Sequence, residues 1–186
     1  MAVERKLITA EELLRLSDDG MRHELLDGEL RTMAPAGGPH GRDGAWAHLH
    51  LGNHIQAHGL GEIFMAETGF LLRRRPARVR APDFAFIRTE RVPTEGLPPG
   101  YVPIAPDLVL EVVSPDDAAA AVRQKVQEWL DFGCRLVWVL FAGPRLDAYG
   151  ADGSVRTYGP DDELDGAEVL PGFRMPLRDL IRPRRR

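Results

Sequence analysis

The chain has 186 residues, of which 44% are hydrophobic, and this suits one globular domain, residues 1–186, with a core of its own. Its single cysteine, Cys134, excludes a disulfide framework and a cysteine-based zinc site, and it fits a reducing cytoplasm. The net charge of −4 argues against a protein that depends on nonspecific affinity for DNA.

The first predicted elements are a short helix and a β-hairpin. A capping-box pattern at Thr9 begins the helix, which is expected to extend to Leu16. The segment "HELLDGELRT" predicts two strands around the turn Asp27-Gly28, a two-residue turn that requires positive φ. This register places Glu24 opposite Arg31.

The middle of the chain predicts a helix, two strands and a loop. Residues 41–58 repeat apolar side chains every four positions and end at Gly59, which indicates a helix. The runs "EIFMAETGFLL" and "VRAPDFAFI" predict two strands joined by an arginine-rich connection. The Pro- and Gly-rich residues 89–105 predict a long irregular loop, of a length that tends to be functional or mobile.

The clearest helix follows a buried strand at 108–114. In "SPDDAAAAVRQKVQEWLDFG", Ser114 is the expected N-cap, Pro115 the first helical residue and Gly133 the stop. "RLVWVLF" predicts another buried strand, and a strand–helix–strand unit implies a parallel pair with a right-handed crossover. A hairpin around Asp152-Gly153 and a short tail element complete the chain.

This order of elements predicts an α/β or mixed α+β fold. The expected parts are an N-terminal helix and hairpin (9–33), a core (40–142) and a C-terminal hairpin and tail (145–186). No internal repeat and no second domain are apparent in the sequence.

A single carboxylate, Glu111, interrupts the buried strand. Strand alternation puts it on one face with Val109 and Val113, opposite Leu110 and Val112. Because an isolated carboxylate in a dry interior would be neutralised, its presence indicates a cationic partner or a bound ion. The alternatives are an ion pair with a helix Arg or Lys, and an edge position at which Glu111 reaches water.

Lys125 is the expected partner of Glu111. It lies about 85° from the centre of the apolar stripe of the predicted helix, where a long side chain can follow the sheet. The helix rises roughly 15 Å from Pro115 to Lys125, and Glu111 lies about 10 Å from Ser114 along the strand. A helix that folds back over the strand therefore brings the two side chains level. The alternative is a surface lysine paired with Glu128.

Asp83 begins the strand "APDFAFI" after a proline and completes a set of two acids and an amine. Its alternative is ordinary turn chemistry, because Pro-Asp pairs recur in this chain. Oxygen atoms of Asp83 and Glu111 would hold Mg²⁺, or Mn²⁺ as a substitute, with waters and a phosphate as further ligands. Lys125 would orient or deprotonate the attacking water and stabilise charge on the phosphate oxygens.

The chain resembles the Uma-two family, a branch of the PD-(D/E)XK nuclease superfamily, in six ordered segments between about residues 9 and 180: "HELLDGEL", "PHGR", "VRAPDFAFI", "APDLVLEVVSP", "QKVQEWLDFGCRLVWVL" and "LPGF". The resemblance implies a restriction-endonuclease-like core, with a mixed central sheet flanked by helices, extra β-hairpins and one metal-binding face. It matches Asp83 to the first acid and Glu111 to the second, and it includes Val112 in the metal-binding set.

The resemblance also departs from the family pattern at one place. The usual lysine two positions after the second acid is Val113, so Lys125 would supply the ammonium from the helix, a relocation known in this superfamily. Glu24 and His40 lie in matching segments and are expected in the same catalytic cleft. Glu24 has an alternative as the partner of Arg31, and His40 is either a phosphate contact before the helix or a plain loop histidine.

Other polar groups have weaker patterns. The arginines before Asp83 would grip DNA phosphates or form a solvated hairpin tip: Arg73, Arg74, Arg75, Arg78 and Arg80. The C-terminal "RPRRR" is expected to be a disordered tail with incidental affinity for nucleic acid. His50, His54 and His58 have a spacing that can bind zinc, but a polar helix face gives the same pattern.

These observations predict a Mg²⁺-dependent endonuclease that hydrolyses phosphodiester bonds of DNA in the cytoplasm. A second hypothesis is a non-catalytic module that binds nucleic acid or a protein on a nuclease fold, and a third is a zinc protein. Because nucleases that cut duplex DNA often pair two sites, a dimer or tetramer is expected. No membrane partner is expected, since the longest apolar run, 136–142, is too short to span a bilayer and the N-terminus lacks an apolar signal segment.

Overall fold

The computed structural model describes residues 7–16, 20–115 and 117–181. Its helices are α1 (Ala10–Leu14), α2 (Gly38–Ala57), the short 3-10 helix η1 (Thr89–Arg91), α3 (Ala119–Phe132) and α4 (Leu177–Leu180). Its strands are β1 (Arg22–Leu26), β2 (Glu29–Met33), β3 (Gly61–Met65), β4 (Phe70–Arg74), β5 (Ala77–Arg80), β6 (Phe84–Arg88), β7 (Leu108–Val113), β8 (Leu136–Phe141), β9 (Arg145–Gly150), β10 (Val155–Tyr158), β11 (Glu163–Gly166) and β12 (Leu170–Pro176). The predicted "RPRRR" tail lies outside the described residues.

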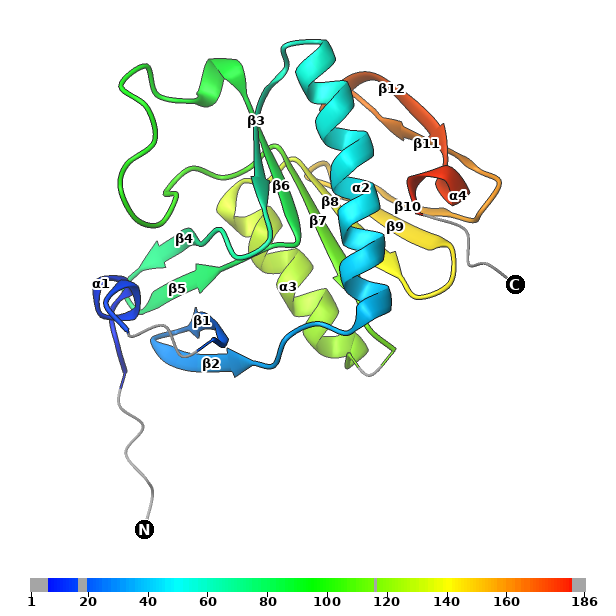
Figure 1. The fold of residues 1–186 in the computed structure, drawn as a ribbon. Coiled ribbons are helices and arrows are strands. Elements are labelled where there is room, and N and C mark those ends of the chain that lie inside the picture. Colours follow the sequence, from blue (N-terminus) through cyan, green and yellow to red (C-terminus); the bar gives the residue numbers. More distant parts are fainter. Residues whose placement is uncertain (1–6, 17–19, 116, 182–186) are drawn as a thin grey trace.

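The strands form three sheets (Figure 1). Six strands pair in the order β10-β9-β8-β7-β6-β3, four in the order β2-β1-β5-β4, and β11 pairs with β12. The neighbouring strands β7 and β8 are parallel and are joined through α3, as the sequence predicts, whereas β6 and β9 run antiparallel to them. The fold is therefore the expected mixed α+β class, with a mixed central sheet flanked by helices.

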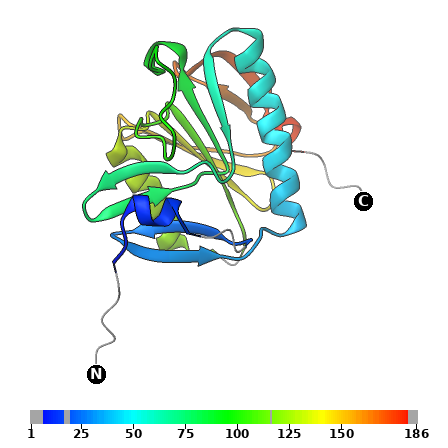
Figure 2. The ribbon, with the colours of Figure 1, turned by 60° about the vertical axis from the view of Figure 1, so that its left-hand side comes forward.

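Two helices cover opposite faces of the six-stranded sheet (Figure 2). Leu110 and Val112 pack in one core cluster with Leu51 of α2, whereas Val109 packs in another with Trp129 of α3. This confirms the predicted alternation along β7. Among the described residues, no helix combines the length and the apolar character needed to cross a bilayer.

Several local signals are confirmed. The Thr9 hydroxyl accepts the Glu12 N–H at 3.1 Å, and the Glu12 carboxylate accepts the Thr9 N–H at 2.7 Å, which completes the capping box. The turn Asp27-Gly28 has φ values of 55° and 83°, as a two-residue hairpin turn requires. Gly133 ends α3 with φ of 106°.

The two predicted middle strands are each broken, and this expectation was wrong. The run "EIFMAETGFLL" divides into β3 and β4, and "VRAPDFAFI" divides into β5 and β6, so each contributes to two sheets. In the second run Pro82 has no N–H to donate to a neighbouring strand, and the Ala81 N–H donates to the Glu24 carboxylate at 3.0 Å. Residues 81–83, here called the seam, carry the chain from the four-stranded to the six-stranded sheet and leave Asp83 between them.

Two helix starts also differ from expectation. The helix α2 begins at Gly38, so His40 lies in its first turn and not before it. The helix α3 begins at Ala119, and Ser114 does not cap it. The Asp117 N–H donates to the Ser114 carbonyl at 3.1 Å, while the Asp117 carboxylate accepts the Ser114 N–H at 2.8 Å. This closed turn uses the groups that an N-cap at Ser114 would need.

Candidate active site

The five predicted catalytic residues line one cavity of about 450 Å³. It lies where the four-stranded sheet meets the C-terminal end of β7, between the first turn of α2 and the first half of α3. Its wall includes all of the following side chains: Glu24, His40, Asp83, Glu111 and Lys125. The seam therefore brings together residues that are up to about a hundred positions apart in the chain.

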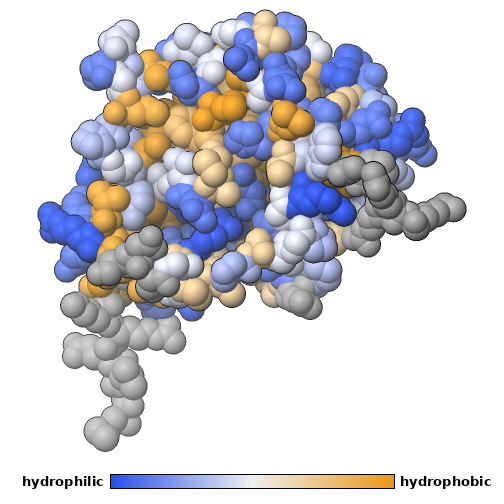
Figure 3. Space-filling model, viewed as in Figure 1, coloured by the Kyte–Doolittle hydropathy of each residue, from blue (hydrophilic) through white to orange (hydrophobic). Residues whose placement is uncertain are grey.

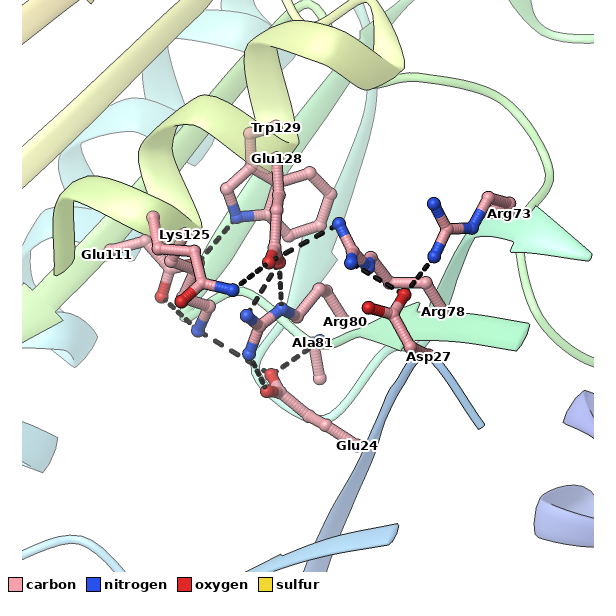
Figure 4. Close-up of polar contacts among 11 residues, drawn as sticks. Glu24, Asp27, Arg73, Arg78, Arg80, Ala81, Glu111, Lys125, Glu128 and Trp129 are labelled. Carbon is pink, nitrogen blue, oxygen red and sulfur yellow. Dashed lines mark hydrogen bonds and ion pairs between the residues drawn. The ribbon is translucent and has the colours of Figure 1, made fainter. Parts of the chain in front are cut away.

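The helix α3 holds Glu111 with two hydrogen bonds. The Lys125 ammonium donates to Oε2 at 2.8 Å, and the Trp129 indole N–H donates to Oε1 at 2.8 Å (Figure 4). Lys125 and Trp129 are one helical turn apart, so they reach the same carboxylate. The predicted contact between Lys125 and Glu111 is confirmed, and Glu128 is not the partner of Lys125. Trp129 was not predicted as a partner of Glu111.

Glu24 is the second carboxylate near Lys125, with 3.6 Å between the ammonium and Oε1. Its Oε2 accepts a hydrogen bond from Arg80 at 2.6 Å. The alternative pairing of Glu24 with Arg31 was wrong, although the two residues are opposite in the hairpin, because Arg31 contacts Glu29 at 3.3 Å. Burial opposes ionisation, but Lys125 and Arg80 lower the pKa of Glu24 below its ordinary value.

The ion pairs continue away from the cavity with alternating sign (Figure 4). Glu128 accepts a hydrogen bond from Arg80 at 2.7 Å and lies 3.4 Å from Arg78. Arg78 contacts Asp27 at 2.6 Å, and Arg73 contacts the same carboxylate. The resulting ladder joins β1, β5 and α3 around the turn of the first hairpin.

The arginines expected to bind DNA have different environments. Arg80 is only 8% exposed and lies between two carboxylates, so its expected contact with DNA was wrong. Arg73 and Arg78 belong to the ladder at its exposed end. The side chain of Arg74 is 72% exposed, with Glu11 at 3.7 Å, and Arg75 is exposed. A DNA contact of these four outer arginines stays a prediction.

Asp83 lies at the junction of the sheets with three neighbours. Its Oδ2 accepts the Val112 N–H at 2.8 Å and is 3.4 Å from Nε2 of His40, and its Oδ1 is 3.6 Å from the Arg22 guanidinium. Burial acts against ionisation, yet the hydrogen bonds from His40 and Val112 lower the pKa of Asp83. Asp83 is therefore an anion positioned directly beside β7. Arg22 had no signal in the sequence pattern.

The imidazole of His40 lies between two acceptors. Its hydrogen bond to Asp83 raises the pKa of His40 against the effect of burial, and its hydrogen bond to the Val112 backbone acts in the same direction. The Asp83 carboxylate and the Val112 backbone thus converge on one point, which the His40 imidazole contacts. A cation held by these oxygen atoms would compete with His40 for them.

Burial and charges of both signs act on Glu111. Burial raises the pKa of Glu111 to about 7; Lys125 opposes this rise, and the carboxylates of Asp83 and Glu24 add to it. Burial alone would lower the pKa of Lys125, but Glu111 and Glu24 raise it. Lys125 therefore lies between two carboxylates, those of Glu111 and Glu24. Arg80 and Arg22 add positive charge beside Glu24 and Asp83, so the cavity wall carries charges of both signs.

The donor set fits Mg²⁺ or Mn²⁺. Among the described residues, no three His, Cys, Asp or Glu side chains converge closely enough to hold an ion. Mg²⁺, however, commonly takes one or two carboxylates and completes its shell with water and phosphate. Asp83, Glu111 and the Val112 backbone supply oxygen atoms only. Each Glu111 oxygen accepts one hydrogen bond already, which leaves a lone pair for an ion.

The histidine stripe offers no comparable site in the part of the chain that the structure describes. The rings of His54 and His58 lie 4.2 Å apart, His54 Nε2 contacts the Pro171 carbonyl at 3.0 Å, and His58 Nδ1 contacts the His54 carbonyl at 2.9 Å. His50 stacks on Trp46. The two carbonyl contacts each occupy one ring nitrogen of His54 and of His58, and no three possible ligands converge among the described residues.

Comparisons with known proteins identify the fold and the family. A crystal structure from Anabaena variabilis, described as "a putative nuclease belonging to DUF820", is similar with a TM-score of 0.80 and 18% identity over 93% of this chain and 97% of that chain. At 18% identity this similarity shows the fold alone. No protein with a curated description matches the sequence. The family model Uma2, described as "Putative restriction endonuclease", matches residues 10–178, and the chain therefore belongs to this family.

Proposed function

We propose that the protein is a Mg²⁺-dependent endonuclease that hydrolyses phosphodiester bonds of DNA. The observation that carries the proposal is the convergence of Asp83, Glu111 and Lys125 on one cavity. Membership of a family described as "Putative restriction endonuclease" supports the nuclease class. The donor set of Asp83, Glu111 and the Val112 backbone consists of oxygen atoms, which supports the choice of a hard divalent cation.

Each residue has a role in this proposal. Asp83, Glu111 and the Val112 backbone would hold the metal ion, which supplies Lewis acidity and an acidified water when bound. Lys125 remains an ammonium because Glu111 and Glu24 raise its pKa, so it acts as a donor that orients the water and stabilises phosphate charge, and not as a base. Glu24 is a positioning residue, since it contacts Lys125 from β1.

The experiment is a cleavage assay on circular plasmid and on short DNA strands with Mg²⁺. We expect Asp83→Asn and Lys125→Met each to slow cleavage by about a hundredfold or more, because each removes a group that acts on the reacting phosphate. Arg123→Met, an exposed change on the same helix, is the matched control for Lys125→Met and should cleave like the natural protein.

Two outcomes would contradict the proposal. Cleavage that is unchanged in both Asp83→Asn and Lys125→Met would remove the assigned residues from the reaction. Cleavage that persists in EDTA would remove the metal. Circular dichroism of each variant excludes loss of fold as the cause.

A non-catalytic module that binds nucleic acid or a protein is the second candidate. It is favoured by Val113, which stands at the position where the family pattern has a lysine. Val113 packs against the core cluster that contains Trp129 of α3. Calorimetry with Mn²⁺ separates the two candidates, because only the enzyme needs to bind a metal ion. In that case Asp83→Asn should abolish the binding. The enzyme proposal also places the protein in the cytoplasm as a dimer or tetramer. Analytical sedimentation measures the oligomeric state.

A further inference from the structure

A second cavity of about 740 Å³ adjoins the candidate active site. The two cavities share the side chains of Arg22, His40 and Asp83 as a common wall. The candidate metal ligand Asp83 thus lies at their junction. A phosphate bound beside Asp83 would have Lys125 on one side and the second cavity on the other.

The second cavity is lined mostly by small and apolar groups. The helix α2 contributes Gly41, Gly44 and Ala45, which share one helical face. His48 continues this face; its ring packs edge-on against the buried core at 5.1 Å from Phe84, and burial lowers its pKa, so the ring is neutral at pH 7. The wall is therefore suited to a flat, uncharged group.

The rest of the lining supports the same chemistry. Tyr101 and the exposed Met65 add aromatic and apolar surface, and Glu67 is the carboxylate in the lining besides Asp83. Among the described lining residues, Arg22 is the single lysine or arginine. A row of phosphates would find few cations here, whereas a base would find aromatic and apolar contacts.

Apolar surface extends beyond the cavity. Figure 3 shows apolar residues gathered over β3 and the facing part of α2. The exposed large apolar residues of these two elements are Leu49 (47% exposed), Ile63 (37%) and Met65 (66%), and Met65 also lines the cavity. Exposed apolar patches that continue from a pocket mark binding surfaces.

We propose that the second cavity takes the base of an unpaired nucleotide, next to the phosphate bound at Asp83. Its volume is in the range of pockets for small ligands and is too small for a duplex. An enzyme that binds a base in such a pocket acts on single-stranded DNA or on a nucleotide taken out of the stack. The preferred substrate is therefore DNA with an unpaired nucleotide at the cleaved position. This inference rests on the proposed function.

Two substitutions on α2 would fill the cavity. A Cβ atom at Gly41 meets nothing within 4 Å, and leucine favours a helix more than glycine does, so Gly41→Leu should fold normally. Ala45→Leu enlarges an exposed side chain on the same face. The matched control is Ala57→Leu, an exposed alanine of the same helix that lines neither cavity.

The experiment measures binding of single-stranded DNA with one 2-aminopurine and of the matching duplex, with Ca²⁺ in place of Mg²⁺. The natural protein should bind the single strand at least about tenfold more tightly than the duplex and raise the 2-aminopurine fluorescence as the base leaves its neighbours. Gly41→Leu and Ala45→Leu should each weaken single-strand binding about tenfold and abolish this rise. Ala57→Leu should match the natural protein.

Equal binding by the filled variants, or a preference for the duplex, would overturn the inference. A change of oligomeric state in Gly41→Leu would assign the cavity to a second copy of the chain and would also overturn it. If Mg²⁺-dependent cleavage requires Asp83 and Lys125 while the filled variants still cleave normally, the inference fails and the proposed function stands. If DNA is neither cleaved nor bound, the proposed function fails, and the inference that rests on it fails as well.

Discussion

Glu111 occupies a buried position with opposing influences. Burial and the carboxylates of Asp83 and Glu24 favour its protonated form, whereas Lys125 favours the anion. Its pKa of about 7 lies above the ordinary value of 4.5. Between these two pH values the folded protein keeps a proton that the unfolded chain releases. A group whose pKa is raised by folding stabilises the protein when protonated, and this contribution is lost as pH rises through 7.

This predicts a difference in the pH dependence of stability between the natural protein and Glu111→Gln. The glutamine does not titrate, so the natural protein should lose stability relative to the variant between about pH 5 and pH 7. The relative loss can reach about 1.4 kcal/mol per pH unit. Denaturant unfolding of both proteins across this range measures it. Parallel stability profiles would show that the Glu111 carboxyl titrates alike in folded and unfolded chains.

The central ion pair could be predicted from the sequence because its geometry is local. Strand alternation, helix angle and rise placed Lys125 level with Glu111, even though α3 begins later than expected. Arg80 and Trp129 could not be predicted as partners in the same way. Arg80 reaches Glu24 from a strand 56 positions away, and no periodicity reports which of several arginines turns inward. The role of Arg80 follows from tertiary packing, whereas Trp129 lies one helical turn from Lys125, and an apolar pattern does not report its indole N–H.

At the scale of elements, the seam decides the site. The apolar runs on both sides of Pro82 have strand character, and a sequence pattern cannot tell one long strand from two strands in different sheets. The break depends on Glu24, which accepts the Ala81 N–H from β1. The start of α3 has a similar cause: Ser-Pro is compatible with a helix cap and with a turn, and the Asp117 side chain selects the turn.

The ladder of ion pairs should contribute unequally along its length. Arg80→Met would leave the buried carboxylates of Glu24 and Glu128 without their shared cation, and a loss of about 3–5 kcal/mol in the free energy of unfolding is expected. Arg74→Met, on the neighbouring strand, is the matched control; its pair with Glu11 is exposed, so a change within about 0.5 kcal/mol is expected. Urea unfolding measures both. Equal losses in the two variants would contradict a structural role for the buried part of the ladder.

At the scale of the whole molecule, the fold class was predictable and the cavities were not. The strand–helix–strand unit of β7, α3 and β8 indicates the parallel pair at the centre of the sheet. The two cavities arise where both sheets meet α2, and this meeting involves segments with no common sequence pattern. The net charge of −4 describes the chain as a whole, whereas the pairing of Lys125 with Glu111 and Glu24 is a local arrangement.

Metal binding should therefore stabilise the entire fold, because an ion at Asp83 and Glu111 has its ligands together only in the folded chain. At a Mg²⁺ or Mn²⁺ concentration about a hundred times the dissociation constant, the gain is about 2.7 kcal/mol, or roughly 5–10 °C in Tm for a chain of this size. Protonation of Glu111 competes with the ion, so the shift should be larger at pH 8 than at pH 6. Thermal unfolding with and without metal measures it.

Asp83→Asn should abolish this shift, whereas Asp131→Asn, an exposed carboxylate change on α3, should keep it. A natural protein whose Tm is unaffected by millimolar Mg²⁺ or Mn²⁺ at pH 8 would show that Asp83 and Glu111 hold no divalent cation. The non-catalytic module would then be the better account of the molecule. A shift that Asp83→Asn fails to reduce would instead place the ion elsewhere in the chain, since Asp83 is the carboxylate at which both cavities meet.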